Sequence, residues 1–297
     1  MFRIYLFSSL VFLFSQSYGQ SNLSHDIQYL EGIWIAEDYF NSFEETKSPI
    51  QSKPAFDATD PVALRINTKE MKDGVLNVGY GTLHDHFIRP EVSKYVIFDG
   101  DTIIEQGCFN INVLKADSLD FHCTSGIYDF YGRKSYFTWK FTPDTTLIIY
   151  LPATVNEQEK TIRYKRIAYN FSEEYPYPNP LYYYIRSRML VGNYIVKDST
   201  GRVVCKKMTI GLDGKSKGCN LFANKIFNIS TDIYCGPESL EDYVLLYSFD
   251  KKFEVSSEVF IYNRITENVI GFYSGKWENI EDQSEVRDKI IYTLKKK

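Results

Sequence analysis

Short runs of apolar residues alternate with polar positions through most of the chain, and turn residues separate one run from the next. Between Tyr136 and Phe141 the even positions differ in kind from the odd positions, which is the pattern of a half-buried strand. Asp99-Gly100 separates two apolar runs and provides the positive φ angles of a type I′ hairpin turn. No segment has a long helical period. The pattern predicts an all-β protein whose strands form an antiparallel meander, the order of an up-and-down barrel.

The expected strands are short and are spread over both halves of the chain. In the first half they cover residues 75–80, 94–98, 102–104, 109–114, 119–123, 126–131, 136–141 and 147–151. In the second half they cover residues 194–197, 203–205, 208–210, 243–249, 259–262, 269–273 and 290–294. The apolar residues between 30 and 45 predict a first strand followed by a short helix.

The two halves begin and end alike. The first begins Leu30-Glu31-Gly32-Ile33-Trp34 and ends Ile162-Arg163-Tyr164-Lys165, and the second begins Leu190-Val191-Gly192-Asn193-Tyr194 and ends Ile291-Tyr292-Thr293-Leu294-Lys295. Matching first and last strands predict two copies of one β-rich unit. The prolines near residues 176–180 cannot donate to a strand ladder, so an extended linker is expected there. We predict barrels over residues 21–167 and 189–297, joined by a Tyr/Pro-rich linker over 168–188.

Residues 1–20 have the pattern of a secretory signal peptide. Arg3 provides the positive start, and the apolar run from Ile4 to Phe14 is too short to span a bilayer comfortably. Small residues Ser17 and Gly19 then precede a cleavage point at Gln20. The expected location is therefore periplasmic or secreted. A buried N-terminal helix is the alternative interpretation.

Composition and charge exclude some partners. Hydrophobic residues make up 44% and charged residues 24% of the 297 positions, which is normal for a soluble globular protein. The net charge of −4 becomes −5 once Arg3 is removed with the signal, so nucleic acid is not an expected partner. No later segment has the length and apolarity of a membrane span. Tyr and Phe are abundant, and they form either core pairs or a ligand-stacking surface.

Three of the four histidines form the sharpest candidate site. On a strand, His84 and His86 would point to one face, together with Tyr80. His122 could be a third ligand if its strand lies opposite, and three imidazoles would suit Zn²⁺. The alternative is that they are polar rim residues, hydrogen-bonded to solvent or neighbours. No other cofactor is expected.

No catalytic signature accompanies these histidines. There is no Gly-x-Ser-x-Gly nucleophile elbow, and Gly79-Tyr80-Gly81 does not open a phosphate-binding helix. Glu91, Glu105 and Asp129 are unranked candidates for a glycosidase pair.

The five cysteines indicate a compartment that permits disulfides and leave one thiol over. Cys108 and Cys123 lie symmetrically about an expected turn, so a bridge across that hairpin is predicted if their Cβ atoms approach closely enough. Cys219 could pair with Cys235 or with Cys205. We favour Cys235, which leaves Cys205 free.

The first strand resembles the lipocalin-like families (calycins), which share a Gly-x-Trp on that strand. Gly32 and Trp34 match it, and so does the Ile-Ile-Tyr-Thr-Leu-Lys ending of the chain. Gly192 and Tyr194 depart from the pattern because Tyr replaces Trp, and the usual central Thr-Asp-Tyr is missing. The resemblance implies a barrel plugged by the aromatic residue at one end and open to a ligand at the other. The chain looks like the tandem lipocalin-like proteins of unknown function that Bacteroidetes-type bacteria export.

A second resemblance concerns the latter half. Gly218-Cys219-Asn220 is similar to the Gly-Cys-Asn signature of META domains, which are also small β-rich units.

Two functions remain open. The first is an exported, non-catalytic protein that binds a small apolar or amphipathic ligand or a partner, with the first half as the likelier ligand carrier. The second is a hydrolase or metal-dependent enzyme centred on His84 and His86. The lack of a recognisable catalytic set favours the first.

Overall fold

The structure is a computed structural model of the whole chain. It describes residues 30–56, 60–70, 75–83, 87–88, 94–98, 101–105, 109–112, 119–123, 134–140, 146–151, 158–168, 180–230, 241–249, 255–279 and 284–297. Within these ranges, none of the helices has the length and apolar character needed to cross a membrane.

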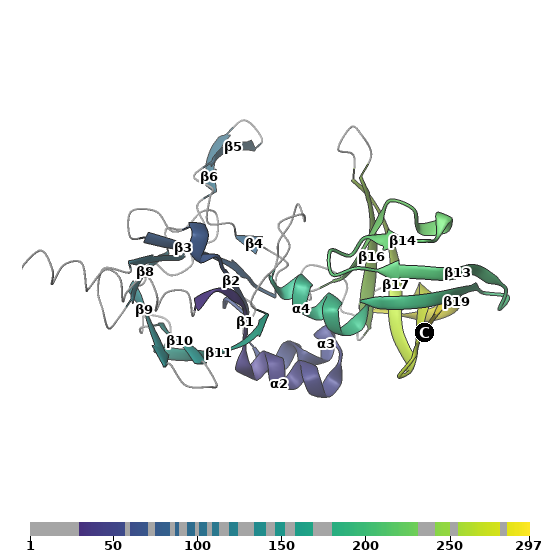
Figure 1. Ribbon diagram of the computed structural model, residues 1–297, viewed down its shortest axis with the longest axis horizontal. Helices are drawn as coiled ribbons and strands as arrows, with labels where there is room; N and C mark the ends of the chain where they lie inside the picture. Colours follow the sequence, from purple (N-terminus) through teal and green to yellow (C-terminus); the bar gives the residue numbers. More distant parts are fainter. Residues whose placement is uncertain are drawn as a thin grey trace, which may run out of the picture. The chain divides into compact units, whose positions relative to one another are not determined.

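The first sheet has nine antiparallel strands that follow one another nearly in chain order (Figure 1). They are β1 (Gly32–Ala36), β2 (Ala63–Ile66), β3 (Val75–Gly81), β4 (Phe87–Ile88), β7 (Phe109–Asn112), β8 (Leu119–Cys123), β9 (Lys134–Lys140), β10 (Thr146–Leu151) and β11 (Lys160–Ala168). Their order in the sheet is β2-β1-β11-β10-β9-β8-β7-β3-β4, and β2 also pairs with β3. The strands β5 (Lys94–Phe98) and β6 (Asp101–Glu105) form a separate hairpin.

The second sheet has eight strands and the same plan. They are β12 (Gly192–Asp198), β13 (Val203–Ile210), β14 (Ser216–Lys217), β15 (Lys225–Ile229), β16 (Asp242–Phe249), β17 (Val255–Thr266), β18 (Val269–Asn279) and β19 (Ser284–Lys296). Their order is β14-β13-β12-β19-β18-β17-β16-β15. An isolated bridge joins Lys215, just before β14, to Ile226 on β15. In both sheets the first strand of the meander pairs with the last.

The chain divides into two compact units that are interleaved in sequence. The first unit contains residues 1–34, 65–79 and 88–171, and the second contains residues 35–64, 80–87 and 172–297. The predicted boundary at 168–188 falls between the last strand of the first sheet and the first strand of the second. The connection between β1 and β2 belongs to the second unit, although both strands are part of the first sheet.

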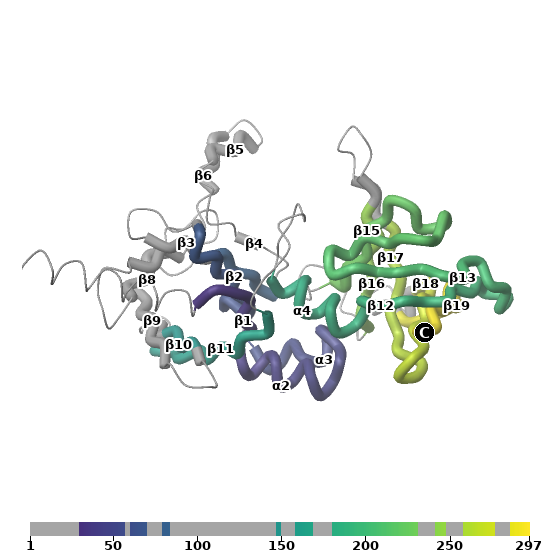
Figure 2. The backbone as a smooth tube through the Cα atoms, viewed as in Figure 1, coloured from purple at the N-terminus to yellow at the C-terminus, as the bar shows by residue number. Residues whose placement is uncertain are grey.

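Among the described residues of the second unit, the α-helices are α2 (Glu37–Thr46), α3 (Pro49–Ser52) and α4 (Pro180–Met189), and short 3-10 helices cover Lys53–Ala55 and Asn220–Phe222. Lys47 ends α2 in the left-handed conformation, with a φ of 54°. Ser48 begins α3, because its hydroxyl accepts from the Gln51 backbone N–H at 3.2 Å and Pro49 needs no backbone partner there. Figure 2 shows β12 leaving the end of α4.

The starts of β1 and β12 have the same local structure. The indole Nε1 of Trp34 donates to the Leu30 carbonyl at 2.8 Å, and the Tyr194 hydroxyl donates to the Leu190 carbonyl at 2.7 Å. All four residues are buried. Each aromatic side chain therefore bonds back to the leucine four residues before it, as expected for two copies of one unit.

The structure confirms the predicted all-β class with antiparallel sheets, and it also confirms the short helix after the first strand. The hairpin around Asp99-Gly100 forms as β5 and β6, with Lys94 opposite Glu105. The helix α4 was not expected, because its residues were assigned to an extended linker. Closure of each sheet into a barrel stays a prediction.

The favoured pairing of Cys219 with Cys235 is wrong. Cys219 forms a disulfide with Cys205, with their Cα atoms 5.5 Å apart, and Cys235 lies outside the described residues. The antiparallel return from β13 brings residue 219 back beside residue 205, and this proximity cannot be read from spacing alone. The other predicted bridge stays untested: Cys108 lies outside the described residues, and Phe109 is the residue opposite Cys123.

Candidate functional site

The predicted histidine site falls largely outside the described residues. His84 and His86 are not described, and His122 lies on β8 with its backbone opposite Asn110 and Lys134. Tyr80 lies buried on β3. Among the side chains that the structure describes, no three His, Cys, Asp or Glu residues gather closely enough to hold a metal ion. The zinc site stays a prediction.

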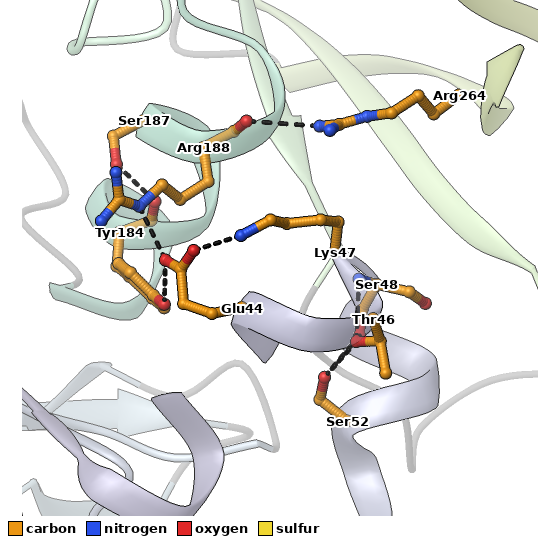
Figure 3. Close-up of polar contacts among 9 residues, drawn as sticks. All are labelled: Glu44, Thr46, Lys47, Ser48, Ser52, Tyr184, Ser187, Arg188 and Arg264. Carbon is orange, nitrogen blue, oxygen red and sulfur yellow. Dashed lines mark hydrogen bonds and ion pairs between the residues drawn. The ribbon is translucent and has the colours of Figure 1, made fainter. Parts of the chain in front are cut away.

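The densest described polar cluster joins α2 to α4 within the second unit, and its centre is Glu44 (Figure 3). One carboxylate oxygen accepts from the Tyr184 hydroxyl at 2.8 Å and lies 2.8 Å from Nε of Arg188. The other oxygen accepts from Nζ of Lys47. Three donors therefore satisfy this carboxylate, which joins the two helices.

The surroundings of Glu44 stabilise its ionised form. Partial burial favours the neutral carboxyl, but the hydrogen bonds from Lys47 and Tyr184 and the charge of Arg188 outweigh that effect and lower the pKa of Glu44. The hydrogen bond between Tyr184 and Glu44 has the opposite effect on the pKa of Tyr184. Burial and the adjacent carboxylate raise the pKa of its hydroxyl, so it remains a donor at any physiological pH.

Aromatic packing surrounds this polar contact. The Tyr184 ring stacks on Phe40 with a centroid distance of 5.6 Å and tilts against Phe43 at 5.2 Å. Arg188 covers the Tyr184 ring at 5.8 Å, and its backbone carbonyl accepts from Arg264 on β17 at 3.4 Å. One face of α2 is thus fixed to α4 by both apolar and charged contacts.

A second carboxylate, Asp242, contacts α3, which follows α2 directly and forms a helical hairpin with it. It is the first residue of β16, and its Oδ1 accepts from the Ile50 backbone N–H in α3 at 3.1 Å. Burial raises the pKa of Asp242 to about 6, and the bonds from Ile50 and Ser48 only partly offset that effect. Asp242 and Glu44 therefore both anchor the α2–α3 hairpin, but their surroundings raise the pKa of Asp242 and lower the pKa of Glu44.

Five aromatic rings meet on the second sheet, and we call them the aromatic pentad. They are Phe222, Phe227, Phe260, Phe272 and Tyr292. Phe222 contacts Phe227 and Tyr292, each at 5.3 Å between centroids. Phe272 contacts Phe227 at 6.2 Å and Phe260 at 6.0 Å, and Phe260 contacts Tyr292 at 6.0 Å. Each ring thus touches two others, and the contacts close a circle.

The pentad requires a strongly curled sheet. Phe227 lies on β15 and Phe272 on β18, three strands apart in the order, so in a flat sheet they would be separated by roughly 14 Å. The observed 6.2 Å brings them together. Phe222, Phe227 and Phe272 are fully buried, whereas Phe260 and Tyr292 are partly exposed beside the ion pair of Lys225 with Glu258. The rings therefore fill the concave side at this level.

Neither anchor of the helical hairpin, Glu44 or Asp242, was predicted from the sequence. Glu44 is one acidic residue among several on a short helix, and its partners lie about 140 positions further along the chain. Asp242 directly precedes the predicted strand 243–249, at a position where an acidic residue is usually exposed. Only its half-buried setting under α3 distinguishes it, and no local pattern encodes that setting.

No protein-family model matches this chain, and none of the curated proteins is similar enough to it to count as a relative. What the protein does must be inferred from its own residues and contacts.

Proposed function

We propose that this protein is an exported, non-catalytic binding protein, made of two lipocalin-like barrels in tandem, that takes a small apolar or amphipathic ligand. One observation carries the proposal: two meanders of the same plan each begin with a buried aromatic residue that bonds to the leucine four positions earlier. In lipocalin-like proteins this residue plugs the closed end of a barrel, as the resemblance of Gly32 and Trp34 implies.

The strand pairings support barrel closure. In the first sheet, the extra pairing of β2 with β3 links two strands that are far apart in the order. In the second, the bridge between Lys215 and Ile226 links the segment before β14 to β15, which are the two ends of that sheet. The curvature that the pentad requires points the same way. A barrel of about eight strands encloses one small ligand when its inner side chains leave room.

The two sheets have different tasks in this proposal. The pentad rings fill the concave side of the second sheet, which then serves as a rigid scaffold. The first sheet is the ligand carrier, and its first strand holds the Trp34 plug. Tyr80 on β3, with His84 and His86 after it in the sequence, would border the ligand.

The disulfide supports export. Cys205 and Cys219 form a bridge of the kind that persists in oxidising compartments such as the periplasm. N-terminal sequencing of the protein purified from its native host should find a chain that begins at or near Gln20. Retention of Met1 would contradict export.

A ligand screen on the full chain tests the binding function. The full chain is required because residues 35–64 belong to the second unit but include the end of β1 and the start of β2, two strands of the first sheet. Palmitate or another apolar probe should raise the melting temperature, because a ligand that binds only the folded state stabilises it. The His84→Ala, His86→Ala variant should lose any shift caused by Zn²⁺. Phe260→Leu, in the pentad, should keep the palmitate shift, since the second sheet is not the carrier.

The enzyme alternative has its own outcome. Turnover of a glycan, ester or peptide substrate that disappears in the His84→Ala, His86→Ala variant would replace the binding function by a catalytic one. If palmitate binding were lost in Phe260→Leu and retained in the histidine variant, the ligand site would lie on the second sheet.

A further inference from the structure

The hairpin formed by α2 and α3 is fastened at two points inside the second unit. Glu44 near the end of α2 contacts Tyr184 and Arg188 of α4, and Asp242 of β16 accepts from Ile50 in α3. We propose that this hairpin is a pH-sensitive latch, whose two carboxylate anchors respond to acid in opposite directions so that it closes most tightly in mild acid.

The surroundings of Asp242 consist of neutral or acidic groups. The Ile50 N–H and the Ser48 hydroxyl at the start of α3 donate to it, and the buried Tyr39 of α2 lies close by. On the sheet, Tyr262 of β17 is directly opposite, and Glu241 precedes it on β16. Among the described residues, no lysine, arginine or histidine forms an ion pair with it.

Two arginines lie near these neighbours and leave Asp242 uncompensated. Arg287 on β19 pairs with Glu241, with Nε and Oε1 2.6 Å apart, and so neutralises that carboxylate. Arg264 interacts with the Tyr262 hydroxyl and with the backbone carbonyl of Arg188. Among the described residues, no counterion therefore faces the ionised form of Asp242 in its poorly solvated site, and such a site favours the neutral carboxyl.

The sign of the effect at Asp242 follows from linkage. Burial raises its pKa to about 6 in the folded protein from the ordinary 3.8. Its contribution to docking is fully present below the ordinary value and is lost as the pH rises through about 6. The protonated carboxyl keeps an oxygen that accepts from Ile50. Mild acid therefore tightens this anchor without removing its hydrogen bond.

Glu44 has the opposite sign. Its pKa is lowered from the ordinary 4.5, so its contribution is present above that value and is lost as the pH falls through the lowered one. Lys47 and Arg188 hold the ionised form in place. Both anchors favour docking only between the pH at which Glu44 protonates and the pH at which Asp242 ionises.

Hydrogen exchange of the full chain tests the latch. Protection factors of the amides in residues 37–52, corrected for intrinsic exchange, would be measured at about pH 5 and about pH 7.5. Linkage with the cited values predicts protection about tenfold higher at the lower pH. Equal protection at the two pH values would overturn the proposal.

Three variants assign the effect to residues. Asp242→Asn mimics the neutral carboxyl and should raise protection at about pH 7.5 by roughly a hundredfold and abolish the pH dependence. Glu44→Gln should lower protection at both pH values and keep their ratio. Asp288→Asn is the matched control, because it removes one exposed carboxylate from β19. A tenfold ratio that persists in Asp242→Asn, or that disappears in Asp288→Asn, would contradict the assignment. The pH comparison of the unaltered chain remains decisive if a variant does not fold.

Discussion

The first strands β1 and β12 carry the same motif, and the comparison between them shows which part of it the fold requires. Trp34 and Tyr194 differ in ring size and in donor atom, yet each donates to a leucine carbonyl at nearly the same distance. The fold thus requires a buried aromatic ring whose donor atom reaches the carbonyl of the leucine four residues earlier. A search for Trp alone finds the first copy and misses the second.

The glycines of the two motifs meet different neighbours. A Cβ on Gly32, whose φ is 130°, would come 2.2 Å from the backbone carbonyl oxygen of Ala168. A Cβ on Gly192 would come 2.9 Å from Cε of Lys296, the far end of a flexible side chain. In the first copy the last strand approaches with its backbone, and Arg166 covers the Trp34 ring at 5.0 Å. The last strand therefore leaves less room at the first-strand glycine in the first copy than in the second.

The largest effect is expected from removing the buried ring of Trp34. Trp34→Ala should destabilise the first unit by about 4 kcal/mol, because it leaves a cavity and an unpaired Leu30 carbonyl. Urea unfolding followed by hydrogen exchange of peptides from each unit would measure it. Equal loss of protection in both units would show that the two plugs do not act separately.

The disulfide between Cys205 and Cys219 lies within the second unit, so removing it tests the stability of that unit. Cys205→Ser combined with Cys219→Ser should cost the second unit about 3 kcal/mol, because the bridge closes a loop with a sequence separation of 14. The same urea experiment under non-reducing conditions measures the loss. An unchanged midpoint for the second unit would mean that the bridge contributes nothing to its stability.

The two glycines should differ in cost. Gly32→Ala should destabilise its unit by about 3 kcal/mol, because the backbone conformation is strained for alanine and the carbonyl of Ala168 cannot move away cheaply. Gly192→Ala should cost about 1 kcal/mol, since the Lys296 side chain can turn aside. Thermal unfolding of the two variants gives the difference. Equal losses of stability in the two variants would contradict the inferred difference in space around the two glycines.

The smallest effect concerns a single hydroxyl. Tyr194→Phe keeps the ring and removes the donor to the Leu190 carbonyl, so a loss of about 1 kcal/mol is expected in the second unit. Tyr194→Trp is the informative partner variant, because an indole reaching the same carbonyl should recover most of that loss. A Tyr194→Phe variant as stable as the original would show that the ring alone serves as the plug.

The sequence predicted those parts of the fold that depend on local pattern. Strand positions such as 94–98 and the Asp99-Gly100 turn follow from alternation and from turn chemistry within a few residues. The matched ends at Gly32 and Gly192 identified the repeat. These features need no knowledge of distant parts of the chain.

The parts that were missed depend on non-local contacts. The disulfide partner of Cys219 is decided by how β13 returns, and α4 lies in a segment whose prolines and tyrosines read as extended. Asp242 became an anchor only through burial beneath a hairpin inserted between β1 and β2. The predicted residues His84 and His86 lie outside the described residues.

The insertion of the α2–α3 hairpin has a consequence for the order of synthesis. The hydrogen bond from Ile50 to Asp242 joins positions 192 residues apart, and the hairpin leaves the ribosome long before its partners on α4 and β16 exist. Such distant contacts slow folding. Until the C-terminal strands are made, the nascent chain carries an undocked hairpin whose apolar face, with Tyr39 and Phe43, has no native surface to cover it. Docking of the hairpin is therefore a late step in the folding of the second unit.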